Sequence, residues 1–233
     1  MPSSGEVAVV IPARDESDRI GATVKAASCL PGVDLVVVVD DGSRDGTGAV
    51  AEGSGAVVVR HTRSRGKGGA METGAETVRL LDSQQSRETA RHLLFLDADL
   101  GDTAQYAGPL AEPVLRGEAD MTIAVFSSTV KLGGHGFVVR LAGGGIERAT
   151  GWRPAQPLNG QRCLTRAAYE AALPLAPGFG TETALTIDLL RKGMRVREVE
   201  VPLAHRATGT DWHAQLHRAR QFADVGRALA RRR

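Results

Sequence analysis

Cysteine is scarce in this chain of 233 residues, which contains only two. Cys29 and Cys163 lie far apart in the sequence and form no Cys-x-x-Cys pair, so the sequence indicates neither a zinc site nor a disulfide framework. Long apolar runs are also lacking, because strings such as residues 35–39 are far too short to span a bilayer. Residues 1–6 lack the basic segment and apolar stretch of a signal peptide. We therefore expect a cytoplasmic protein with at most peripheral membrane contact.

An excess of charge of one sign is absent as well. The chain has 29 Lys and Arg against 27 Asp and Glu, a formal net charge of +2, so we expect no nucleic-acid partner. Hydrophobic residues make up 42% of the chain, which is enough for one substantial core. Neither an internal repeat nor a linker interrupts the sequence. These features predict a single domain over residues 1–233.

Short β-branched runs alternate with helical patterns in the first half of the chain. Four runs are typical of buried parallel strands, namely residues 7–11, 35–39, 56–59 and 93–96. Residues 17–30, with Ser17 as a candidate N-cap, and residues 67–81 have helical spacing. The repeated units predict an α/β fold with a mainly parallel, doubly wound sheet.

The second half gives a less regular pattern. Its predicted elements are helices over residues 103–116 and 181–192, strands over 121–126 and 196–201, and a helix from residue 211 onward. The glycine-rich segment 127–145 is predicted to be a surface loop, with closure over a ligand as the alternative.

Polar residues follow the predicted strands, at the edge where open α/β sheets bind ligands. Asp97 and Asp99 follow the run 93–96 and could share a divalent cation, although a solvated turn or a helix cap explains a lone Asp-x-Asp about as well. Asp40 ends the second strand and could accept a hydrogen bond from a nucleobase imide. A turn that feeds a helix is compatible with that role.

The segment Arg65-Gly66-Lys67-Gly68 leads into a predicted helix. Backbone N–H groups and one cation therefore meet where a diphosphate could bind, with a flexible basic turn as the simpler alternative. Lys67 is not followed by Ser or Thr, so this is not a Walker loop. No Gly-x-Gly-x-x-Gly pattern follows the first strand, which disfavours a dinucleotide-binding dehydrogenase.

Taken together, the blocks at residues 9–16, 38–43, 66–68 and 97–99 resemble the inverting GT-A glycosyltransferases that include polyisoprenyl-phosphate sugar synthases. The resemblance implies a GT-A fold in which residues 7–105 bind a nucleotide sugar, with a UDP-sugar as the expected donor. It implies a metal, Mn²⁺ or Mg²⁺, held by Asp99 as a catalytic residue. It also implies a donor site made of Pro12, Ala13, Arg14, Glu16, Asp40, Gly66, Lys67, Asp97 and Ala98.

Later blocks, at residues 157–162, 178–182 and 201–206, resemble glucosyl-3-phosphoglycerate synthases, which retain anomeric configuration. This resemblance implies that His205 is a second metal ligand, with a structural histidine as the alternative. Glu182 is predicted to be catalytic, as a base or a sugar ligand, or only to favour the helix dipole. In the acceptor-binding half, residues 106–209, the predicted contacts to sugar or acceptor come from Asn159, Gly160, Gln161, Arg162 and Thr181.

The sequence therefore predicts a metal-dependent glycosyltransferase with polyprenyl phosphate as the acceptor. A soluble small acceptor, such as a phosphoglycerate or a secondary metabolite, and a nucleotide-binding module without turnover remain alternatives. The stereochemical outcome and a homodimer stay open. Residues 210–233 are predicted to form a basic helix that either contacts an anionic membrane or packs on its own domain.

Overall fold

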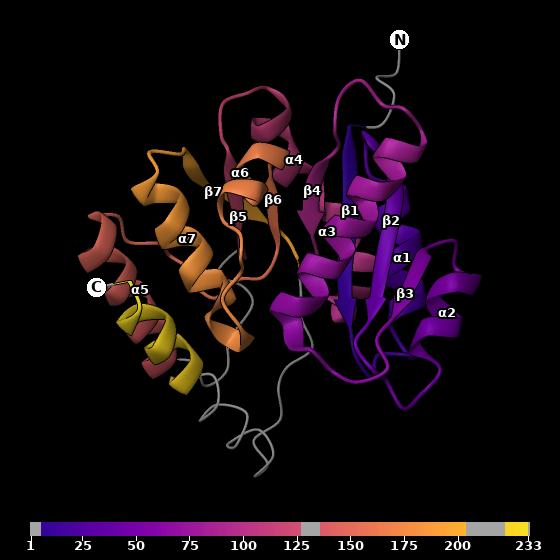
Figure 1. Ribbon diagram of the computed structural model, residues 1–233, viewed down its shortest axis with the longest axis horizontal. Coiled ribbons are helices and arrows are strands. Elements are labelled where there is room, and N and C mark those ends of the chain that lie inside the picture. The colour runs from indigo at the N-terminus through magenta and orange to yellow at the C-terminus, as the bar shows by residue number, and fades with distance from the viewer. Residues whose placement is uncertain (1–5, 127–135, 204–221, 233) are drawn as a thin grey trace.

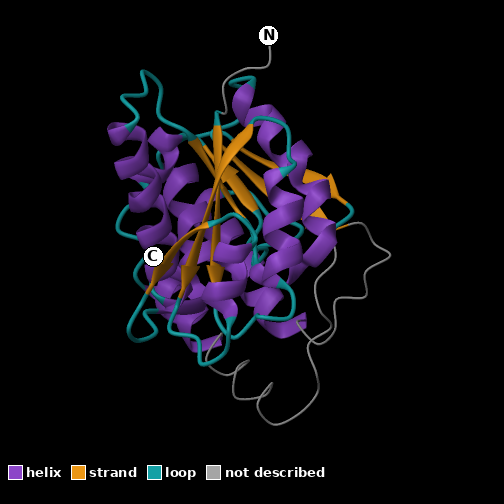
Figure 2. Ribbon diagram, turned by 90° about the vertical axis from the view of Figure 1, so that its right-hand side faces the viewer, coloured by secondary structure: helices purple, strands orange, loops and turns teal. Residues whose placement is uncertain are grey.

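A seven-stranded sheet is the centre of the fold in the computed structural model, which describes residues 6–126, 136–203 and 222–232 (Figure 1). The strands are β1 (Val7–Ala13), β2 (Val33–Asp40), β3 (Val57–Arg60), β4 (His92–Phe95), β5 (Met121–Phe126), β6 (Arg162–Leu164) and β7 (Val196–Val201). Their order is β3-β2-β1-β4-β6-β5-β7. Helices cover both faces of the sheet (Figure 2), as the doubly wound prediction requires.

Most neighbouring strands are parallel. β6 is the exception, because it pairs antiparallel with both β4 and β5. The two reversals cancel, so β5 runs in the direction of β1, and the carboxyl ends of β1, β2, β4 and β5 lie at one edge of the sheet. The prediction of a mainly parallel sheet is confirmed, while the three-residue β6 was not predicted. We call the shared edge the carboxyl edge.

The helices match the predicted ones with a few differences. They are α1 (Ile20–Ser28), α2 (Thr47–Gly53), α3 (Gly66–Gln84), the 3₁₀ segment η1 (Ala98–Ala107), α4 (Gly108–Leu115), α5 (Gly136–Thr150), α6 (Arg166–Ala171), the 3₁₀ turn η2 (Gly178–Gly180), α7 (Thr181–Arg191) and a helix at residues 222–230. Ser17 does not cap α1, because the helix begins at Ile20 and the Ser17 N–H donates to the Asp45 carboxylate.

The glycine-rich segment corrects the predicted loop. Its part from residue 136 onward forms α5, while residues 127–135 lie outside the described residues. A Cβ atom at Gly145 would collide with the Leu229 side chain, so this glycine allows the C-terminal helix at residues 222–230 to pack closely on α5. Figure 1 shows the two helices together near the C-terminus.

The C-terminal helix packs on its own domain. Val225 is fully buried, Ala228 is 4% exposed, and Arg232 pairs with Asp188 of α7. The predicted helix is therefore present over residues 222–230, and residues 211–221 lie outside the described part. Within the described residues, no helix is both long and apolar enough to cross a membrane.

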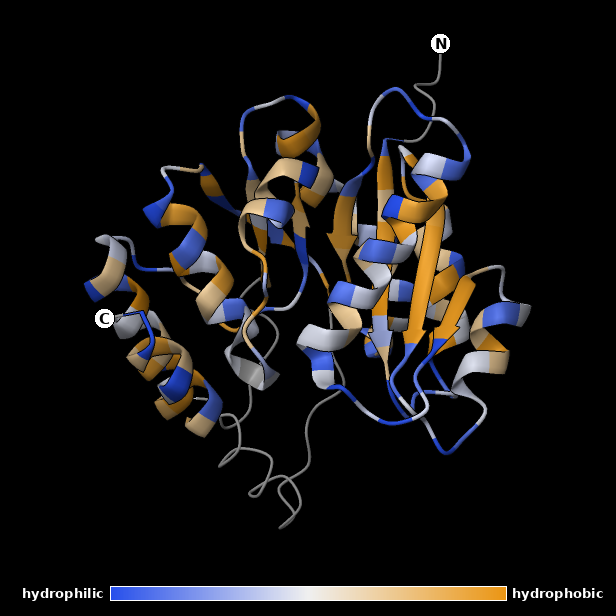
Figure 3. Ribbon diagram, in the orientation of Figure 1, coloured by the Kyte–Doolittle hydropathy of each residue, from blue (hydrophilic) through white to orange (hydrophobic). Residues whose placement is uncertain are grey.

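Hydrophobic side chains on the two faces of the sheet form the core, and Figure 3 shows the apolar colouring of β1 and β2. α1, η1 and α4 cover one face, whereas α3, α6 and α7 cover the other. α3 lies so close to the sheet that a Cβ atom at Gly74 would overlap the Val10 side chain. This packing fixes the first turn of α3, which carries Lys67, at the carboxyl edge.

Candidate active site

Lys67 lies between two carboxylates that come from opposite halves of the chain. Its Nζ is 2.8 Å from Asp97 Oδ1, just beyond β4, and 2.9 Å from Glu182 Oε1 in the first turn of α7. The Glu182 side chain is 7% exposed, while Lys67 and Asp97 are about one-quarter exposed. Burial alone would lower the pKa of Lys67, but the negative charges of Asp97 and Glu182 and their hydrogen bonds raise it. Lys67 therefore remains a cation at any physiological pH.

Gly160 closes one side of this cluster. A Cβ atom at this position would overlap Lys67 Nζ and lie 2.9 Å from Asp97 Oδ1. On the other side, a Cβ atom at Gly68 would lie 2.8 Å from the Ala176 carbonyl oxygen and 3.0 Å from Thr181 Oγ1. Small residues are therefore required where the two halves of the chain meet around Lys67.

Replacing Gly160 by alanine is expected to reduce activity more than stability. The added methyl group displaces Lys67 Nζ, the end of a flexible side chain, so we expect at most about 1 kcal/mol of lost stability. The ion pair with Asp97 is distorted, and we expect turnover to fall about tenfold or more. Gly144→Ala is the matched control, because a Cβ atom there meets nothing within 4 Å. Equal turnover in the two variants would contradict this account of Gly160.

The predicted nucleoside-binding residues are gathered at the carboxyl edge. Pro12 and Ala13 end β1, Arg14 and Glu16 follow it, and Asp40 ends β2. The loops after the two strands are joined, because the Asp15 and Glu16 N–H groups donate to the hydroxyls of Ser43 and Thr47. Asp15 adopts a φ of 54°, in the left-handed region that a non-glycine residue occupies only where its surroundings hold it.

Asp40 is fully buried at this edge. Its Oδ1 accepts a hydrogen bond from the Ser43 N–H at 2.8 Å, and Oδ2 lies 3.4 Å from Arg60 Nε. Among the described residues, Oδ2 accepts no hydrogen bond. A buried carboxylate oxygen with unused acceptor capacity fits the predicted contact with a nucleobase imide, which stays a prediction.

Asp41 organises the loop before α3, a role that the sequence analysis did not assign. Its carboxylate accepts hydrogen bonds from the Ser64 hydroxyl and from the N–H groups of Arg65 and Gly66, and it lies 2.7 Å from His61 Nδ1. Burial alone would raise the pKa of Asp41, but these hydrogen bonds lower it. The loop that leads to Lys67 is thus built around one carboxylate.

Replacing Asp41 by asparagine is expected to lower the free energy of unfolding by about 2 kcal/mol at neutral pH, because the amide group cannot accept from both backbone N–H groups. In the parent, a lowered pKa means that this stabilisation is complete above the unfolded-state pKa and is lost as the pH falls through the folded-state value. Urea unfolding at pH 7 and at about pH 3 should therefore show a smaller difference between the two proteins in acid. A difference that grows in acid would refute this role.

The Asp97-Ala98-Asp99 segment turns directly from β4 into η1. The Thr23 hydroxyl donates to the Ala98 carbonyl at 2.8 Å, and Arg19 Nη1 donates to the Asp99 carbonyl at 3.1 Å, so α1 and the residue before it hold the backbone of this turn. Asp99 is half-buried in the first turn of η1. With Asp97 engaged by Lys67, the Asp99 carboxylate is the predicted metal ligand of this segment.

The predicted metal site stays a prediction. Half-buried carboxylate oxygens at the carboxyl edge are the ligand type that Mg²⁺ and Mn²⁺ prefer, so Asp99 fits either ion. His205, the other predicted ligand, lies outside the described residues. Within the described part of the chain, no group of three or more His, Cys, Asp or Glu is arranged to hold a metal ion.

The predicted acceptor-binding residues are more deeply buried than a ligand contact requires. Asn159 binds its own loop, donating to Gln156 Oε1 and accepting from the Gln161 N–H. The Thr181 hydroxyl donates to the carbonyls of Ala176 and Gly178. Gln161 and Arg162 are fully buried. For Arg162 the predicted direct contact with sugar or acceptor does not fit, because carbonyl and hydroxyl groups of the protein surround its guanidinium.

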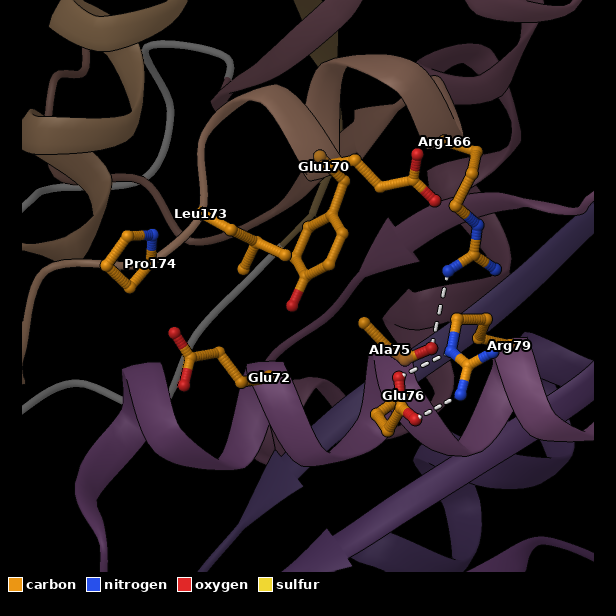
Figure 4. Close-up of a pocket in the computed structure, with 9 residues that line it drawn as sticks. Glu72, Ala75, Glu76, Arg79, Arg166, Glu170, Leu173 and Pro174 are labelled. Carbon is orange, nitrogen blue, oxygen red and sulfur yellow. Dashed lines mark hydrogen bonds and ion pairs between the residues drawn. The ribbon is translucent and has the colours of Figure 1, made fainter.

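A separate cavity of about 510 Å³ lies between α3 and α6, away from Lys67 (Figure 4). Tyr169, Leu173 and Pro174 line one side, and charged residues of α3 line the other. Figure 4 shows the Arg166 guanidinium pointing toward α3, where it donates to the Ala75 carbonyl at 3.3 Å. None of the predicted site residues lines this cavity.

Comparison with known proteins identifies the family of this chain. Residues 8–158 match the family described as "Glycosyl transferase family 2". The glycosyltransferase AglJ of Haloferax volcanii is 29% identical over 215 residues, which cover 91% of this chain and 67% of AglJ. Glucosyl-3-phosphoglycerate synthase of Mycolicibacterium paratuberculosis is 29% identical over 205 residues, 78% of this chain, and the match spans only 59% of that enzyme's length.

Solved structures give the same result for the fold. Glucosyl-3-phosphoglycerate synthase of Mycobacterium tuberculosis, crystallised with phosphoglyceric acid, aligns with a TM-score of 0.75 and 26% identity over 96% of this chain and 80% of that one. The same enzyme with Mn²⁺, UDP and phosphoglyceric acid aligns with a TM-score of 0.73 and 25% identity, over 96% and 78% of the two chains. The predicted GT-A fold is confirmed.

Proposed function

We propose, because the chain belongs to glycosyl transferase family 2, that it transfers a sugar from a UDP-sugar to a phosphate-bearing acceptor in a reaction that requires Mn²⁺ or Mg²⁺. The observation that carries the proposal is the Lys67 ammonium group held between Asp97 and Glu182 at the carboxyl edge. A cation fixed at the start of a helix is suited to a diphosphate leaving group. The tuberculosis enzyme crystallised with Mn²⁺ and UDP supports the choice of donor and metal.

Each residue has a distinct part in this proposal. Asp40 accepts a hydrogen bond from the nucleobase, and Lys67 exchanges a carboxylate contact for the diphosphate. Asp99, with His205, would hold the metal, which supplies Lewis-acid neutralisation of charge on the departing diphosphate. Glu182 then either orients the sugar or accepts a proton from a hydroxyl acceptor. Because Lys67 and Glu182 are in contact, binding of the donor and the environment of Glu182 are coupled.

Phosphoglycerate is the acceptor that we propose. The sequence analysis favoured polyprenyl phosphate, but the comparisons support the soluble alternative better. The mycobacterial relatives are glucosyl-3-phosphoglycerate synthases, and both aligned structures described above contain phosphoglyceric acid. The acceptor in that case has a hydroxyl group as nucleophile, so Glu182 or the donor phosphate must accept its proton.

A second acceptor class, polyprenyl phosphate, is favoured by one surface feature. Phe137 at the start of α5 and Phe222 at the start of the C-terminal helix are 65% and 42% exposed, and their rings stack with centroids 5.5 Å apart. Exposed arginines, Arg140 and Arg227, lie on the same helices. An exposed aromatic pair with basic neighbours is suited to an isoprenoid chain and a lipid surface.

One assay tests the proposal and separates the acceptors. UDP release from UDP-glucose and other UDP-sugars is measured with 3-phosphoglycerate or with polyprenyl phosphate in detergent, each with Mn²⁺ or with a chelator. We expect metal-dependent release that 3-phosphoglycerate stimulates. Stimulation by polyprenyl phosphate alone, lost in Phe137→Ser, would select the second class. Donor binding without turnover under all conditions would leave only the nucleotide-binding alternative.

A further inference from the structure

The most deeply buried charged side chain beside the site is Arg162, the first residue of β6. It is fully buried, and its guanidinium donates to four oxygen acceptors and lies 4.0 Å from Met121 Sδ. Nε donates to the Asn159 carbonyl at 2.8 Å and Nη2 to the Pro157 carbonyl at 3.1 Å. Nη1 donates to the Glu182 carbonyl at 3.0 Å and to the Thr186 hydroxyl at 2.8 Å.

These acceptors belong to the two segments that border Lys67. Asn159 and Pro157 lie in the loop before β6, which also contains Gly160, whose α-carbon faces Lys67 Nζ and Asp97. The Glu182 carbonyl belongs to the residue whose carboxylate is 2.9 Å from Lys67 Nζ. Thr186 accepts from Arg162 and donates to the same Glu182 carbonyl at 2.8 Å. One guanidinium therefore connects the loop before β6 with α7, the two segments that border the Lys67 ammonium group.

The buried cation has no carboxylate partner within ion-pair distance among the described residues. Burial lowers the pKa of Arg162 to about 10, while the charges of Glu182 and Glu198 act to raise it. The group is still charged at neutral pH, and burying such a charge is costly. A fully buried cation whose hydrogen bonds go only to uncharged groups is a poor choice for stability alone. Its planar fork of donors does, however, fix several acceptors in one geometry.

We propose that Arg162 is a positioning residue that holds Glu182 and Gly160 against Lys67 and thereby sets the geometry of the site. Its effect on turnover rests on the proposed function, whereas its effect on the Lys67 environment does not. Arg162 contacts the loop and the first turn of α7 through their backbone, so it acts on the reaction only through Lys67 and Glu182.

The kinetic test compares Arg162→Lys with Arg166→Lys. Arg166 is a second buried arginine, in α6 beside the separate cavity, and it donates to Ala75 and Asp82. We expect both variants to lose thermal stability, but only Arg162→Lys to lose turnover, by 10- to about 100-fold per folded molecule. The KM for the donor should change less than threefold, because the nucleoside-binding residues are untouched. Turnover within twofold of the Arg166→Lys value would overturn the proposal.

A second measurement needs no substrate. The chain has four lysines, and acylation by a water-soluble amine reagent, mapped by mass spectrometry, reports on each of them. In the parent, Lys67 should react far more slowly than the exposed Lys25 and Lys192. In Arg162→Lys, Lys67 labelling relative to Lys25 should rise at least threefold, and in Arg166→Lys it should not. Unchanged Lys67 labelling in Arg162→Lys would overturn the positioning role.

The two measurements separate the two hypotheses. If the parent protein turns over no nucleotide sugar, the proposed function fails, and the labelling experiment alone decides the role of Arg162. If Arg162→Lys does not fold, Thr186→Val replaces it, because this change removes one acceptor of the guanidinium. We then expect a smaller loss of turnover and a smaller rise in Lys67 labelling than in Arg162→Lys. Parent-like values of both would count against the proposal.

Discussion

The Asp99→Ala protein is expected to turn over the nucleotide sugar about 100- to 1,000-fold more slowly than the parent, with no remaining stimulation by Mn²⁺. Asp99 is half-buried at the start of η1. Arg19 donates a hydrogen bond to the Asp99 carbonyl, and Thr23 donates one to the Ala98 carbonyl. The substitution therefore removes the predicted metal ligand without disturbing the backbone contacts that hold the turn. Because Lys67 and Asp97 keep their ion pair, the rest of the site should stay in place.

Asp102→Ala is the matched control for this experiment. Asp102 lies in the same 3₁₀ segment but is exposed and makes none of the contacts that hold the turn. Both variants should unfold at temperatures close to that of the parent. Thermal shift with UDP, with and without Mn²⁺, should show metal-dependent stabilisation in the parent and in Asp102→Ala and none in Asp99→Ala. An Asp99→Ala protein with parent-like turnover in Mn²⁺ would exclude Asp99 as the catalytic metal ligand.

Periodicity alone predicted most of the parallel half of the fold. The runs at residues 7–11 and 35–39 lie within β1 and β2, and residues 121–126 and 196–201 coincide with β5 and β7. These segments are buried and β-branched or alternate regularly, so their local pattern agrees with their tertiary environment. β6 has only three residues, Arg162–Leu164, and begins with a charge. A strand this short is defined by its partners β4 and β5, which no local pattern encodes.

Glycine explains the main error in the fold. Residues 143–145 are three successive glycines, which predict a loop because glycine weakens an isolated helix. In the structure they belong to α5. The Leu229 side chain, from the C-terminal helix, occupies the space that a side chain at position 145 would need. Tertiary packing thus overrides intrinsic propensity. A single sequence gives no sign of which distant residue fills that space.

At the site, the sequence identified residue types better than their roles. Lys67, Asp97 and Glu182 were each predicted, but not that Lys67 Nζ lies within 3 Å of both carboxylates. Glu182 is at least 85 residues from the other two in the sequence, and a local motif does not encode a contact over that separation. Asp41 stands beside Asp40 in the sequence, yet Asp40 ends β2 and Asp41 follows it, and the two carboxylates have different partners. Arg162 was predicted to contact a ligand because it belongs to the block at residues 157–162 that resembles glucosyl-3-phosphoglycerate synthases. Its complete burial could be seen only with the fold.

The second large effect is expected for Lys67→Met, which removes the cation between Asp97 and Glu182. Turnover should fall about 100- to 1,000-fold, because no other group on α3 can neutralise the departing diphosphate at this position. Stability should fall as well, by about 3 kcal/mol, since Glu182 remains buried beside Asp97 without a partner. Urea unfolding at neutral pH measures this loss, with Lys25→Met, an exposed lysine in α1, as the control.

The double variant Lys67→Met with Glu182→Gln separates the two losses. Glutamine carries no charge, so the unpaired buried carboxylate disappears and most of the lost free energy of unfolding should return. Turnover should stay as low as in Lys67→Met, because the diphosphate still has no ammonium group beside it. If instead the double variant recovered turnover together with stability, Lys67 would serve only to neutralise Glu182, and the diphosphate would have to be bound elsewhere at the carboxyl edge.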